Sequence, residues 1–333
     1  AKGYALFLIA GISGYIQFIL RQVFLFAVLM SSTARCLSYT KLEEESPLRL
    51  IDSERKLNPE WPMSGKIEFS KVSMRYREDL DFVIKKISFA IESGEKVACV
   101  GRTGSGKSSL IQIIFRMVEI GEGNVYLDGV DTKSIGLHTL RRNIGIIPQT
   151  PFIFSGSVRK NIDPFDNFSD EEVWSALKEV ELDESVKEFP QGLNSEIGVS
   201  NVSFSSGQKQ LLCLCRAILN KYKVLILDEA TSNVDFETDR MIQKVIRNKF
   251  VKSTVFCIAH RITTIADYEK VLVVADGTVG EIGAPYELLV KNIGDKKITN
   301  EEGHFANLVK NTGVKTAAHI FSIAKEYYMK RNI

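Results

Sequence analysis

Apolar side chains fill most of the first 30 positions, in a pattern unlike that of the rest of the chain. An almost unbroken apolar run covers residues 4–20, Arg21 and Gln22 follow it, and a second apolar run covers residues 23–30. The first run approaches the roughly 20 apolar residues that a membrane-spanning helix needs. The pattern predicts a long helix near the N-terminus, with Arg21 close to the boundary of a membrane.

Three interpretations of this apolar segment are open. A signal peptide requires a basic region before the apolar run and a small-residue cleavage site after it, and neither is found before a folded domain. A buried core helix has a similar composition. A spanning helix that continues into the cytosol fits best, and because no second hydrophobic span follows, the rest of the chain lies on one side. Since the chain begins with Ala and not Met, we expect a fragment or a processed product.

Beyond the apolar segment the pattern changes twice. Residues 41–65 are charged and contain three prolines, as is typical of a linker. From residue 66 onward, short β-like runs alternate with helical stretches, which predicts an α/β domain with a largely parallel sheet. A helical segment near residues 170–220 interrupts this alternation and indicates a subdomain, whereas the tail past Lys291 is polar and then weakly amphipathic. The predicted strands are 67–76, 83–91, 95–101, 124–129, 143–149, 223–229, 253–260 and 270–277, and the predicted helices include 107–117, 171–180 and 209–219.

Composition and charge narrow the classes of partner. The 333 residues are 44% hydrophobic and 25% charged, as in an ordinary folded protein. A formal net charge of +2 gives no electrostatic reason to expect a nucleic-acid partner, so any anion binding must come from a local site. The five cysteines lack the CxxC pairing of zinc sites, and we expect reduced, mostly buried thiols in the cytosol.

A glycine-rich loop follows the β-like run EKVACV. Residues 101–108 read GRTGSGKS and an apolar helical run comes next, which fits the phosphate-binding pattern GxxxxGK[ST] in its strand–loop–helix context. The glycines let backbone N–H groups converge on phosphate oxygens, and the helix N-terminus adds a favourable dipole. Lys107 supplies a positive charge for the β- and γ-phosphates, and the Ser108 hydroxyl can ligate Mg²⁺. A simple turn with a solvated lysine is the alternative, and the context disfavours it.

A second chemical signal is the pair of carboxylates that ends the run VLILDE. Asp228 at the strand end can hold Mg²⁺ through its water shell. Glu229 can polarise the attacking water, a contribution typically worth ~10²–10⁴-fold in rate. An apolar strand that ends in Asp-Glu is common by itself, but together with the loop at 101–108 it indicates a nucleotide site.

Further segments resemble one family of nucleotide-binding proteins. Residues 204–208 read FSSGQ, lie about 20 positions before Asp228 and resemble the LSGGQ signature of ATP-binding cassettes (ABC). Gln149 stands where that family places its Q-loop, residues 232–235 (SNVD) resemble its D-loop, and His260 matches its switch histidine. Tyr76 stands where the family has an aromatic residue that stacks on adenine. His260 or Tyr76 alone would be read as an ordinary core residue, but the ordered set covers nearly all of residues 66–290.

Finer similarities indicate the C subfamily, the multidrug-resistance-associated proteins. They are the segments 137–142 (LHTLRR), 147–149 (IPQ) and 154–165 (FSGSVRKNIDPF), together with an N-terminal segment similar to that subfamily's last transmembrane helix. These exporters carry two cassettes per chain. Because Glu229 is intact and the chain ends soon afterwards, we interpret this one as the second, catalytically competent cassette.

Several positions depart from the family's pattern. Phe204 replaces the usual leucine of the signature, Ser206 replaces a common glycine, Thr150 replaces a frequent aspartate after Gln149, and the D-loop reads SNVD where SALD is commoner. None of these changes removes a catalytic group. The phenylalanine should change only packing at the face of the cassette.

The resemblance implies a fold and a division into parts. We expect an α/β P-loop ABC ATPase cassette with a mixed core sheet, an antiparallel β subdomain and a helical signature subdomain, preceded by a transmembrane helix fragment. Residues 1–40 would end the transmembrane domain, 41–65 form the linker, 66–290 the nucleotide-binding domain and 291–333 the C-terminal tail. The parent would be a multi-pass protein, most simply of the plasma membrane, with the cassette on the cytosolic side.

The implied activity is ATP hydrolysis that drives efflux of organic or anionic solutes. Two cassettes would pair head to tail, with each ATP held between one P-loop and the partner's signature, and the pair would act on the transmembrane domains of the same transporter. The cofactors are ATP and Mg²⁺, with no nucleic acid involved. The assigned catalytic residues are Glu229, His260 and Gln149, the Mg²⁺ ligands are Ser108, Gln149 and Asp228, and the nucleotide-binding residues are Tyr76, Gly101, Thr103, Gly104, Ser105, Gly106, Lys107, Ser108, Ser109, Ser205, Gly207 and Gln208.

Two other functional classes compete with an exporter. Soluble cassette ATPases of DNA repair need a long coiled coil between P-loop and signature, but only about 100 residues separate them here, and those of translation carry no apolar N-terminal helix. A channel or a receptor regulator of the same subfamily has the same motifs, so the cassette alone leaves that alternative open.

Overall fold

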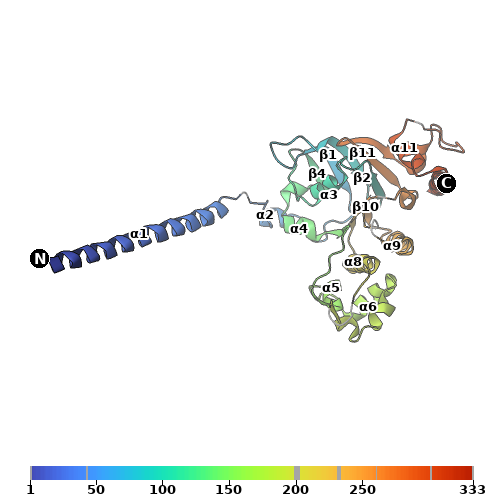
Figure 1. Cartoon of the computed structure of the whole chain (residues 1–333). Coiled ribbons are helices and arrows are strands. Elements are labelled where there is room, and N and C mark those ends of the chain that lie inside the picture. Colours follow the sequence, from blue (N-terminus) through green and yellow to red (C-terminus); the bar gives the residue numbers. More distant parts are fainter. Residues whose placement is uncertain are drawn as a thin grey trace. The chain divides into compact units, whose positions relative to one another are not determined.

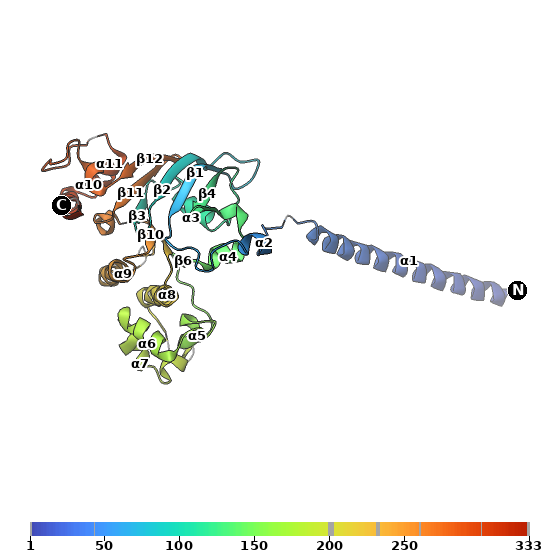
Figure 2. The ribbon, with the colours of Figure 1, turned by 180° about the vertical axis from the view of Figure 1, so that it is seen from behind.

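The computed structural model describes residues 2–42, 44–198, 203–230, 234–259, 261–300 and 302–331. The chain divides into two compact units, Ala1–Ser46 and Pro47–Ile333, and each is described by itself. Figures 1 and 2 show the ribbon from opposite sides. The helices are α1 (Lys2–Tyr39), α2 (Ile51–Glu54), α3 (Lys107–Ile114), α4 (Leu137–Arg142), α5 (Val158–Ile162), α6 (Asp170–Glu179), α7 (Asp183–Lys187), α8 (Ser206–Asn220), α9 (Phe236–Lys249), α10 (Pro285–Leu289), α11 (His304–Lys310) and α12 (Val314–Arg331), with 3₁₀ turns η1 (Thr132–Ser134), η2 (Gly192–Asn194) and η3 (Ile262–Ile265). The strands are β1 (Ile67–Met74), β2 (Ile84–Ile91), β3 (Lys96–Val100), β4 (Glu122–Leu127), β5 (Val130–Asp131), β6 (Ile144–Ile147), β7 (Gly156–Ser157), β8 (Glu196–Ile197), β9 (Val224–Asp228), β10 (Thr254–Ile258), β11 (Lys270–Ala275) and β12 (Thr278–Gly283).

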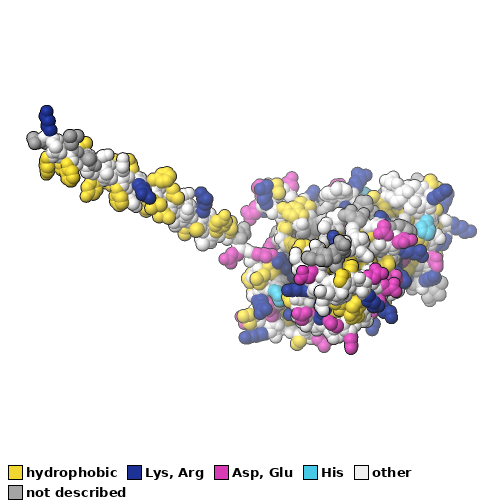
Figure 3. All heavy atoms as spheres, turned by 60° about the horizontal axis from the view of Figure 1, so that its bottom comes forward, with side chains coloured by type: hydrophobic (Ala, Val, Ile, Leu, Met, Phe, Trp, Pro, Cys, Tyr) yellow, Lys and Arg dark blue, Asp and Glu magenta, His cyan; other side chains and the backbone are white. Residues whose placement is uncertain are grey.

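The first unit consists mainly of helix α1. It is one continuous helix of 38 residues, which at 1.5 Å per residue is about 57 Å long. Its described side chains are exposed and mostly apolar, as the yellow spheres along it show in Figure 3. In length and composition α1 qualifies as a membrane-spanning helix. Arg21, expected near a membrane boundary, lies within this unbroken helix. At about 57 Å, α1 is longer than the roughly 30 Å of a bilayer core.

The second unit is built on two sheets. The core sheet has the strand order β12-β11-β3-β10-β9-β6, in which β12 is antiparallel to β11 and the other neighbours are parallel. The second sheet is antiparallel, in the order β2-β1-β4-β5. The predicted mixed core sheet and antiparallel subdomain are therefore confirmed. Because parallel strands end at the same edge, the loops after β3, β6 and β9 share one edge of the core sheet.

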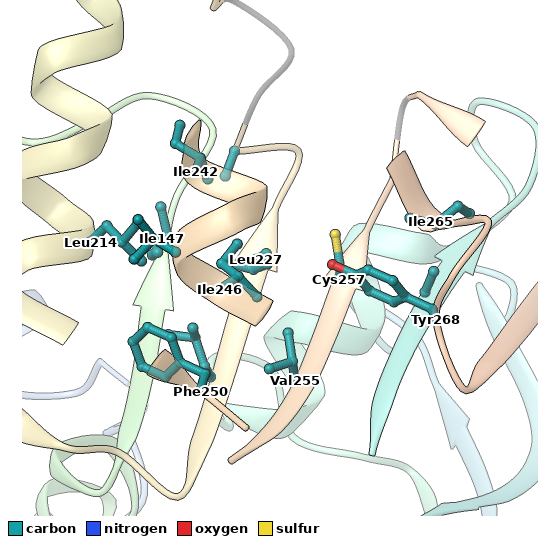
Figure 4. Close-up of a cluster of buried hydrophobic side chains, with 14 of the residues drawn as sticks. Ile147, Leu214, Leu227, Ile242, Ile246, Phe250, Val255, Cys257, Ile265 and Tyr268 are labelled. Atoms are coloured by element: carbon teal, nitrogen blue, oxygen red, sulfur yellow. The ribbon is translucent and has the colours of Figure 1, made fainter. Parts of the chain in front are cut away.

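Apolar side chains cover both faces of the core sheet. On one face, Leu214 of α8 and Ile246 of α9 belong to the same buried cluster as Leu227 and Val255 of the sheet (Figure 4). On the other face, Leu110 of α3 belongs to a cluster that also contains side chains of the antiparallel sheet. Helix α3 is therefore fixed on both sides, which gives the loop before it a rigid base.

A helical subdomain separates β6 from β9. It contains α5, α6, α7 and α8 (Figure 2) and the short antiparallel strand pair β7–β8. The subdomain therefore begins near Gly156, whereas the sequence predicted a start near residue 170. A capping box between Ser169 and Glu172 starts α6, and Val173 and Leu177 of that helix are buried. These features show why a short helical insert can form a stable separate lobe.

Two segments that carried little signal in the sequence are part of the second unit. The first part of residues 47–65 contacts α4, where the Pro47 carbonyl accepts from the N–H of Leu137. The last part contacts the antiparallel sheet, where the Trp61 indole N–H donates to the Leu127 carbonyl at 3.2 Å and the Asp128 carboxylate accepts backbone N–H bonds from Ser64 and Lys66. In the tail, Phe305 of α11 is fully buried, as is Ile320 of α12. The compact unit thus extends on both sides of residues 66–290.

Candidate functional site

The loop between β3 and α3 is shaped by its glycines. A Cβ added at Gly101 would collide with the carbonyl oxygen of Val274, and one added at Gly106 would lie 2.7 Å from Cδ1 of Ile84. Gly104 has a φ of +81°, and a Cβ there would have no described atom within 4 Å. The first two glycines are needed for close packing behind the loop, whereas Gly104 lies on an open face that a phosphate can approach.

The N-terminus of α3 is the centre of this loop. Its N-cap is Gly106, with a left-handed φ of 104°, and no side chain within the described residues caps it. The first N–H groups of the helix are therefore available to an anion, which the helix dipole also favours. The Lys107 ammonium group donates to the carbonyls of Gly101 at 3.0 Å and Arg102 at 2.9 Å, so a cation is held across the loop. Ser108 is exposed on the first turn, and Thr103 is exposed in the loop.

Tyr76 lies beside the first turn of α3. The sequence predicted a strand that includes Tyr76, but strand β1 ends at Met74. Tyr76 therefore lies in the loop that follows the strand. Its hydroxyl group is 2.9 Å from the Ser109 hydroxyl, and its side chain is 43% exposed. The contact anchors one end of the ring and leaves a face of it available to a flat partner.

The acidic pair lies at the end of β9, at the edge of the sheet that also carries the loop. Glu229 has a left-handed φ of 44°, and its N–H donates to the Ile258 carbonyl at 3.2 Å. A left-handed non-glycine residue costs about 1 kcal/mol or more and is typical of functional positions. Burial, and then the charge of Glu229, raises the pKa of Asp228. Two carboxyl groups crowded in this way favour a bound cation.

Gln149 lies in the loop after β6 and reaches the acidic pair. Its side-chain amide nitrogen donates to a carboxylate oxygen of Glu229 at 3.1 Å. The contact follows from the sheet, since β6 runs parallel to β9 with Ile147 opposite Leu227. The structure thus brings together two residues that are 80 positions apart in the sequence.

The signature residues lie at the start of α8. Ser205 is the N-cap of this helix, and it forms a reciprocal capping box with Gln208. Gly207 is buried, and a Cβ there would lie 2.9 Å from Cγ2 of Thr238 on α9. Phe204, which departs from the usual leucine, is buried and packs edge-on against Phe189, with 5.3 Å between ring centroids. Phe204 thus contributes to apolar packing below the signature, and the expectation that it changes nothing else stays a prediction.

The predicted residues form two groups. The loop at 101–108, Tyr76 and Ser109 form one connected region. Gln149, after β6, and the acidic pair at the end of β9 form the other. Within the described residues, no hydrogen bond joins Ser205, Gly207 or Gln208 to that loop. His260 and residues 232–233 of the D-loop lie outside the described residues, so their assigned roles stay predictions.

Two polar residues that the sequence did not single out hold segments next to the site in place. Gln210 of α8 is buried, and its amide donates to the carbonyls of Pro148 at 2.9 Å and Gln149 at 3.0 Å. Arg261 donates to the buried Asp239 carboxylate at 3.2 Å and to the Val234 carbonyl at 3.2 Å. The only sequence signal for Gln210 is its position at the start of an apolar helical run. The sequence around Arg261 contains no signal that predicts its contacts.

The tail contributes a wall to the site, which the sequence also missed. A hollow of about 320 Å³ beside the loop is bounded by residues 101–105, Asp276 and three residues of α11. The hydroxyl of Ser105 is buried and has no hydrogen-bond partner among the described residues. The α11 residues are His304, Asn307 and Leu308, and Asn311 follows directly after the helix.

Comparison with known proteins identifies the family. The sequence profile described as "ABC transporter" matches residues 84–232. ATP-binding cassette sub-family C member 4 of Homo sapiens is 43% identical over 332 residues, which cover all of this chain and 24% of that protein. This chain belongs to the ABC transporter family. It is a nucleotide-binding ATPase cassette of the C subfamily, and ATP is the nucleotide that such a domain binds.

Other relatives support the same assignment. ATP-binding cassette sub-family C member 2 of Homo sapiens is 49% identical over 255 residues, covering 77% of this chain and 16% of that protein. The probable multidrug resistance-associated protein lethal(2)03659 of Drosophila melanogaster is 44% identical over 320 residues, covering 96% of this chain and 23% of that protein. The structure of a bacterial Atm1-family ABC exporter with ATP bound matches with a TM-score of 0.71 at 26% identity, covering 86% of this chain and 47% of that chain. The ABC cassette spans about a quarter or less of the length of these curated relatives.

Proposed function

We propose that this ABC cassette is the second, hydrolytically active cassette of an exporter that moves organic or anionic solutes out of the cell. The contact between Gln149 and Glu229 carries the proposal, because it joins the loop after β6 to the proposed base at the end of β9. In this proposal Glu229 orients and polarises the attacking water. Gln149 relays the state of the nucleotide to the surface that touches the membrane domains.

Mg²⁺ fits the donor groups at this edge of the core sheet. The ion prefers oxygen ligands, and Ser108 offers an exposed hydroxyl, Asp228 a carboxylate and Gln149 an amide oxygen. The raised pKa of Asp228 supports a cation there, since the positive charge would stabilise its ionised form. Bound with ATP, Mg²⁺ would supply charge neutralisation for the β- and γ-phosphates.

The chain's own groups divide the remaining tasks. The backbone N–H groups at the start of α3 and the Lys107 ammonium group would bind the phosphates. Tyr76 would stack on the adenine with its exposed ring face. His260 would orient the water or the γ-phosphate.

The signature supports pairing with a second cassette. Ser205 and Gly207 start a different helix from the phosphate loop, so we assign them to ATP bound on the partner's loop, in a head-to-tail pair. ATP would then hold the two cassettes together, because its γ-phosphate adds contacts that vanish after hydrolysis. Closing and opening of the pair would drive alternating access in the transmembrane domains. Helix α1 would belong to those domains, in a multi-pass parent of the plasma membrane.

Transport by the full-length parent tests this function. Inside-out membrane vesicles that contain the parent should accumulate anionic organic conjugates when ATP and Mg²⁺ are supplied, and the Glu229→Gln variant should not. The Glu60→Gln variant, changed at an exposed acidic residue outside the described site, is the matched control and should transport normally. An ATP-dependent ionic current without solute accumulation would instead identify a channel or a channel regulator.

A further inference from the structure

A second concave surface lies in the C-terminal part of the cassette, between α12 and the segment before α11. It is an open groove of about 880 Å³. One wall is a stripe of α12 side chains that includes Val314, Ala318, Phe321 and Met329. The opposite wall contains Ile298, and the spacing along α12 is that of one helical face. The groove shares no residue with the hollow beside the phosphate loop.

The floor of the groove is apolar and partly open to solvent. Val314 is 89% exposed at one end, whereas Phe321 is 8% exposed and forms part of the base. Exposed apolar surface gathered in one concave strip is typical of a binding site. From Val314 to Met329 the stripe extends about 22 Å along α12, at 1.5 Å per residue.

The rim of the groove is basic. Lysines 296, 297, 310 and 325 line it together with a single acidic residue, Glu326. The Glu326 carboxylate is already paired with Lys330 at 2.6 Å. Neither Lys296 nor Lys297 forms an ion pair within the described part of the chain, and both are exposed. The groove therefore combines an apolar base with an excess of positive charge.

We propose that this groove binds an acidic amphipathic helix of a partner protein. A helix can lay its apolar face along the stripe between Val314 and Met329, as in other helix-in-groove complexes. Acidic residues on the flanks of that helix would then face the lysine rim. The shape favours a helix over a single lipid chain, because small ligands are typically enclosed by their pockets and this groove is open along its length.

The binding experiment uses the full chain in detergent micelles and a synthetic probe. The probe is a fluorescent 18-residue peptide with leucines at i, i+3, i+4 and i+7 spacing and glutamates elsewhere, and its partner probe carries lysines in place of the glutamates. Fluorescence anisotropy should show binding of the acidic probe alone, and the binding should weaken as salt rises. Ala318→Glu places a negative charge in the groove at an exposed position, and it should weaken binding at least tenfold.

The matched control is His319→Glu. His319 is exposed on the same helix and does not line the groove, so this variant should bind the acidic probe as the native chain does. Equal weakening by both variants, or equal binding of the acidic and basic probes, would overturn the proposal. Anionic phospholipid vesicles form a further arm: vesicle binding that Ala318→Glu abolishes, with no peptide binding, would assign the groove to lipid and also overturn it.

Discussion

Two helix N-termini carry the nucleotide motifs of this ABC cassette, and the chain treats them in opposite ways. At α3, the N-cap is a left-handed glycine, Gly106, and no described side chain occupies the first N–H groups. At α8, Ser205 caps the helix and Gln208 completes a capping box, so the chain satisfies that terminus itself. The first terminus is preorganised for an anion, whereas the second is stable without one.

The difference indicates what each terminus contributes. A glycine N-cap such as Gly106 costs only roughly a few tenths of a kcal/mol relative to a serine or aspartate cap, and it leaves the first N–H groups of α3 for a bound phosphate. The capped terminus gives no such gain, so in the proposed head-to-tail pair the nucleotide contact at Ser205 would rest on geometry supplied by the partner cassette. We therefore expect changes at α3 to alter nucleotide binding by the single chain, and changes at Ser205 to alter pairing.

The largest expected effect is on the rate of ATP hydrolysis, in a variant that leaves both helix N-termini unchanged. Glu229→Gln should keep ATP binding and lower the hydrolysis rate by ~10²–10⁴-fold, because the amide keeps the shape and loses the basic carboxylate. With both termini intact, the ATP-bound pair should accumulate as a long-lived complex in sedimentation experiments with the partner cassette. Failure of the pair to accumulate would mean that the catalytic base lies elsewhere.

The next effect concerns the open terminus. Lys107→Ala removes the cation held across the loop and should weaken binding of a fluorescent ATP analogue by about 100-fold, since charged hydrogen bonds of about 1.5–3 kcal/mol are lost. Lys252→Ala, at an exposed turn, is the control and should bind normally. Unchanged affinity in Lys107→Ala would refute the assignment of residues 101–108.

At the capped terminus, the cap and the nucleotide contact can be separated. Ser205→Asp keeps a good N-cap, so the melting temperature should stay within about 2 °C of the native value. Its carboxylate would face the partner's γ-phosphate, and pairing in ATP and Mg²⁺ should weaken at least about tenfold. Ser205→Asn, a neutral cap, is the matched control, and ATP binding by the single chain should be normal in both. Loss of that binding in Ser205→Asp would contradict the head-to-tail pair.

A smaller effect is expected at Tyr76. Tyr76→Ala should weaken ATP binding by about 1–3 kcal/mol, the usual contribution of one base stacked on a ring. Tyr76→Phe keeps the ring and loses only the hydrogen bond to Ser109, so it should lower stability by about 0.5–1.5 kcal/mol and leave ATP affinity nearly unchanged. Isothermal titration and thermal melts measure the two quantities. Equal loss of affinity in both variants would show that the ring is not a stacking surface.

The smallest effect concerns Asp228 and pH. A carboxyl group whose pKa is raised in the folded state is penalised once it ionises, so its contribution to stability falls as pH rises through and above its ordinary value near 4. Without Mg²⁺, Asp228→Asn should therefore raise the melting temperature at pH 7 by up to about 2 °C and leave it unchanged at pH 3. Thermal melts of both proteins in EDTA at pH 7 and at pH 3 measure these shifts. Equal shifts of the melting temperature at the two pH values would exclude ionisation of Asp228 as the cause.

Local patterns predicted the parts of this cassette that depend on neighbours in the sequence. The phosphate loop and the acidic pair were readable because each is a short run at the end of an apolar strand. The contact between Gln149 and Glu229 depends on β6 lying beside β9 in the sheet. The local sequence of either strand does not predict which strand will be its neighbour. The roles given to the site residues, including His260, remain predictions.

The tail shows why part of the core was not predicted. The buried positions of α12 are Ala317, Ile320, Phe321 and Ala324, which have helical spacing. Two of them are alanine, so the contrast between the buried and exposed faces is low. Similarly, Trp61 in the expected linker is buried only because its indole meets the antiparallel sheet at Leu127. Such residues gain their role from distant surfaces that a local pattern does not contain.

Gly207 has a consequence for genetics. Its missing side chain makes room for Thr238, which in turn donates to Asp235 at the start of α9. A mutation that adds a methyl group at Gly207 would therefore be harmful in a screen even if that glycine never touched a nucleotide. Trimming the neighbour, as in Thr238→Ala, should act as a second-site suppressor of the packing defect alone. Under the proposed head-to-tail pairing, the impairment that survives in the double mutant would measure the contact of Gly207 with ATP on the partner cassette.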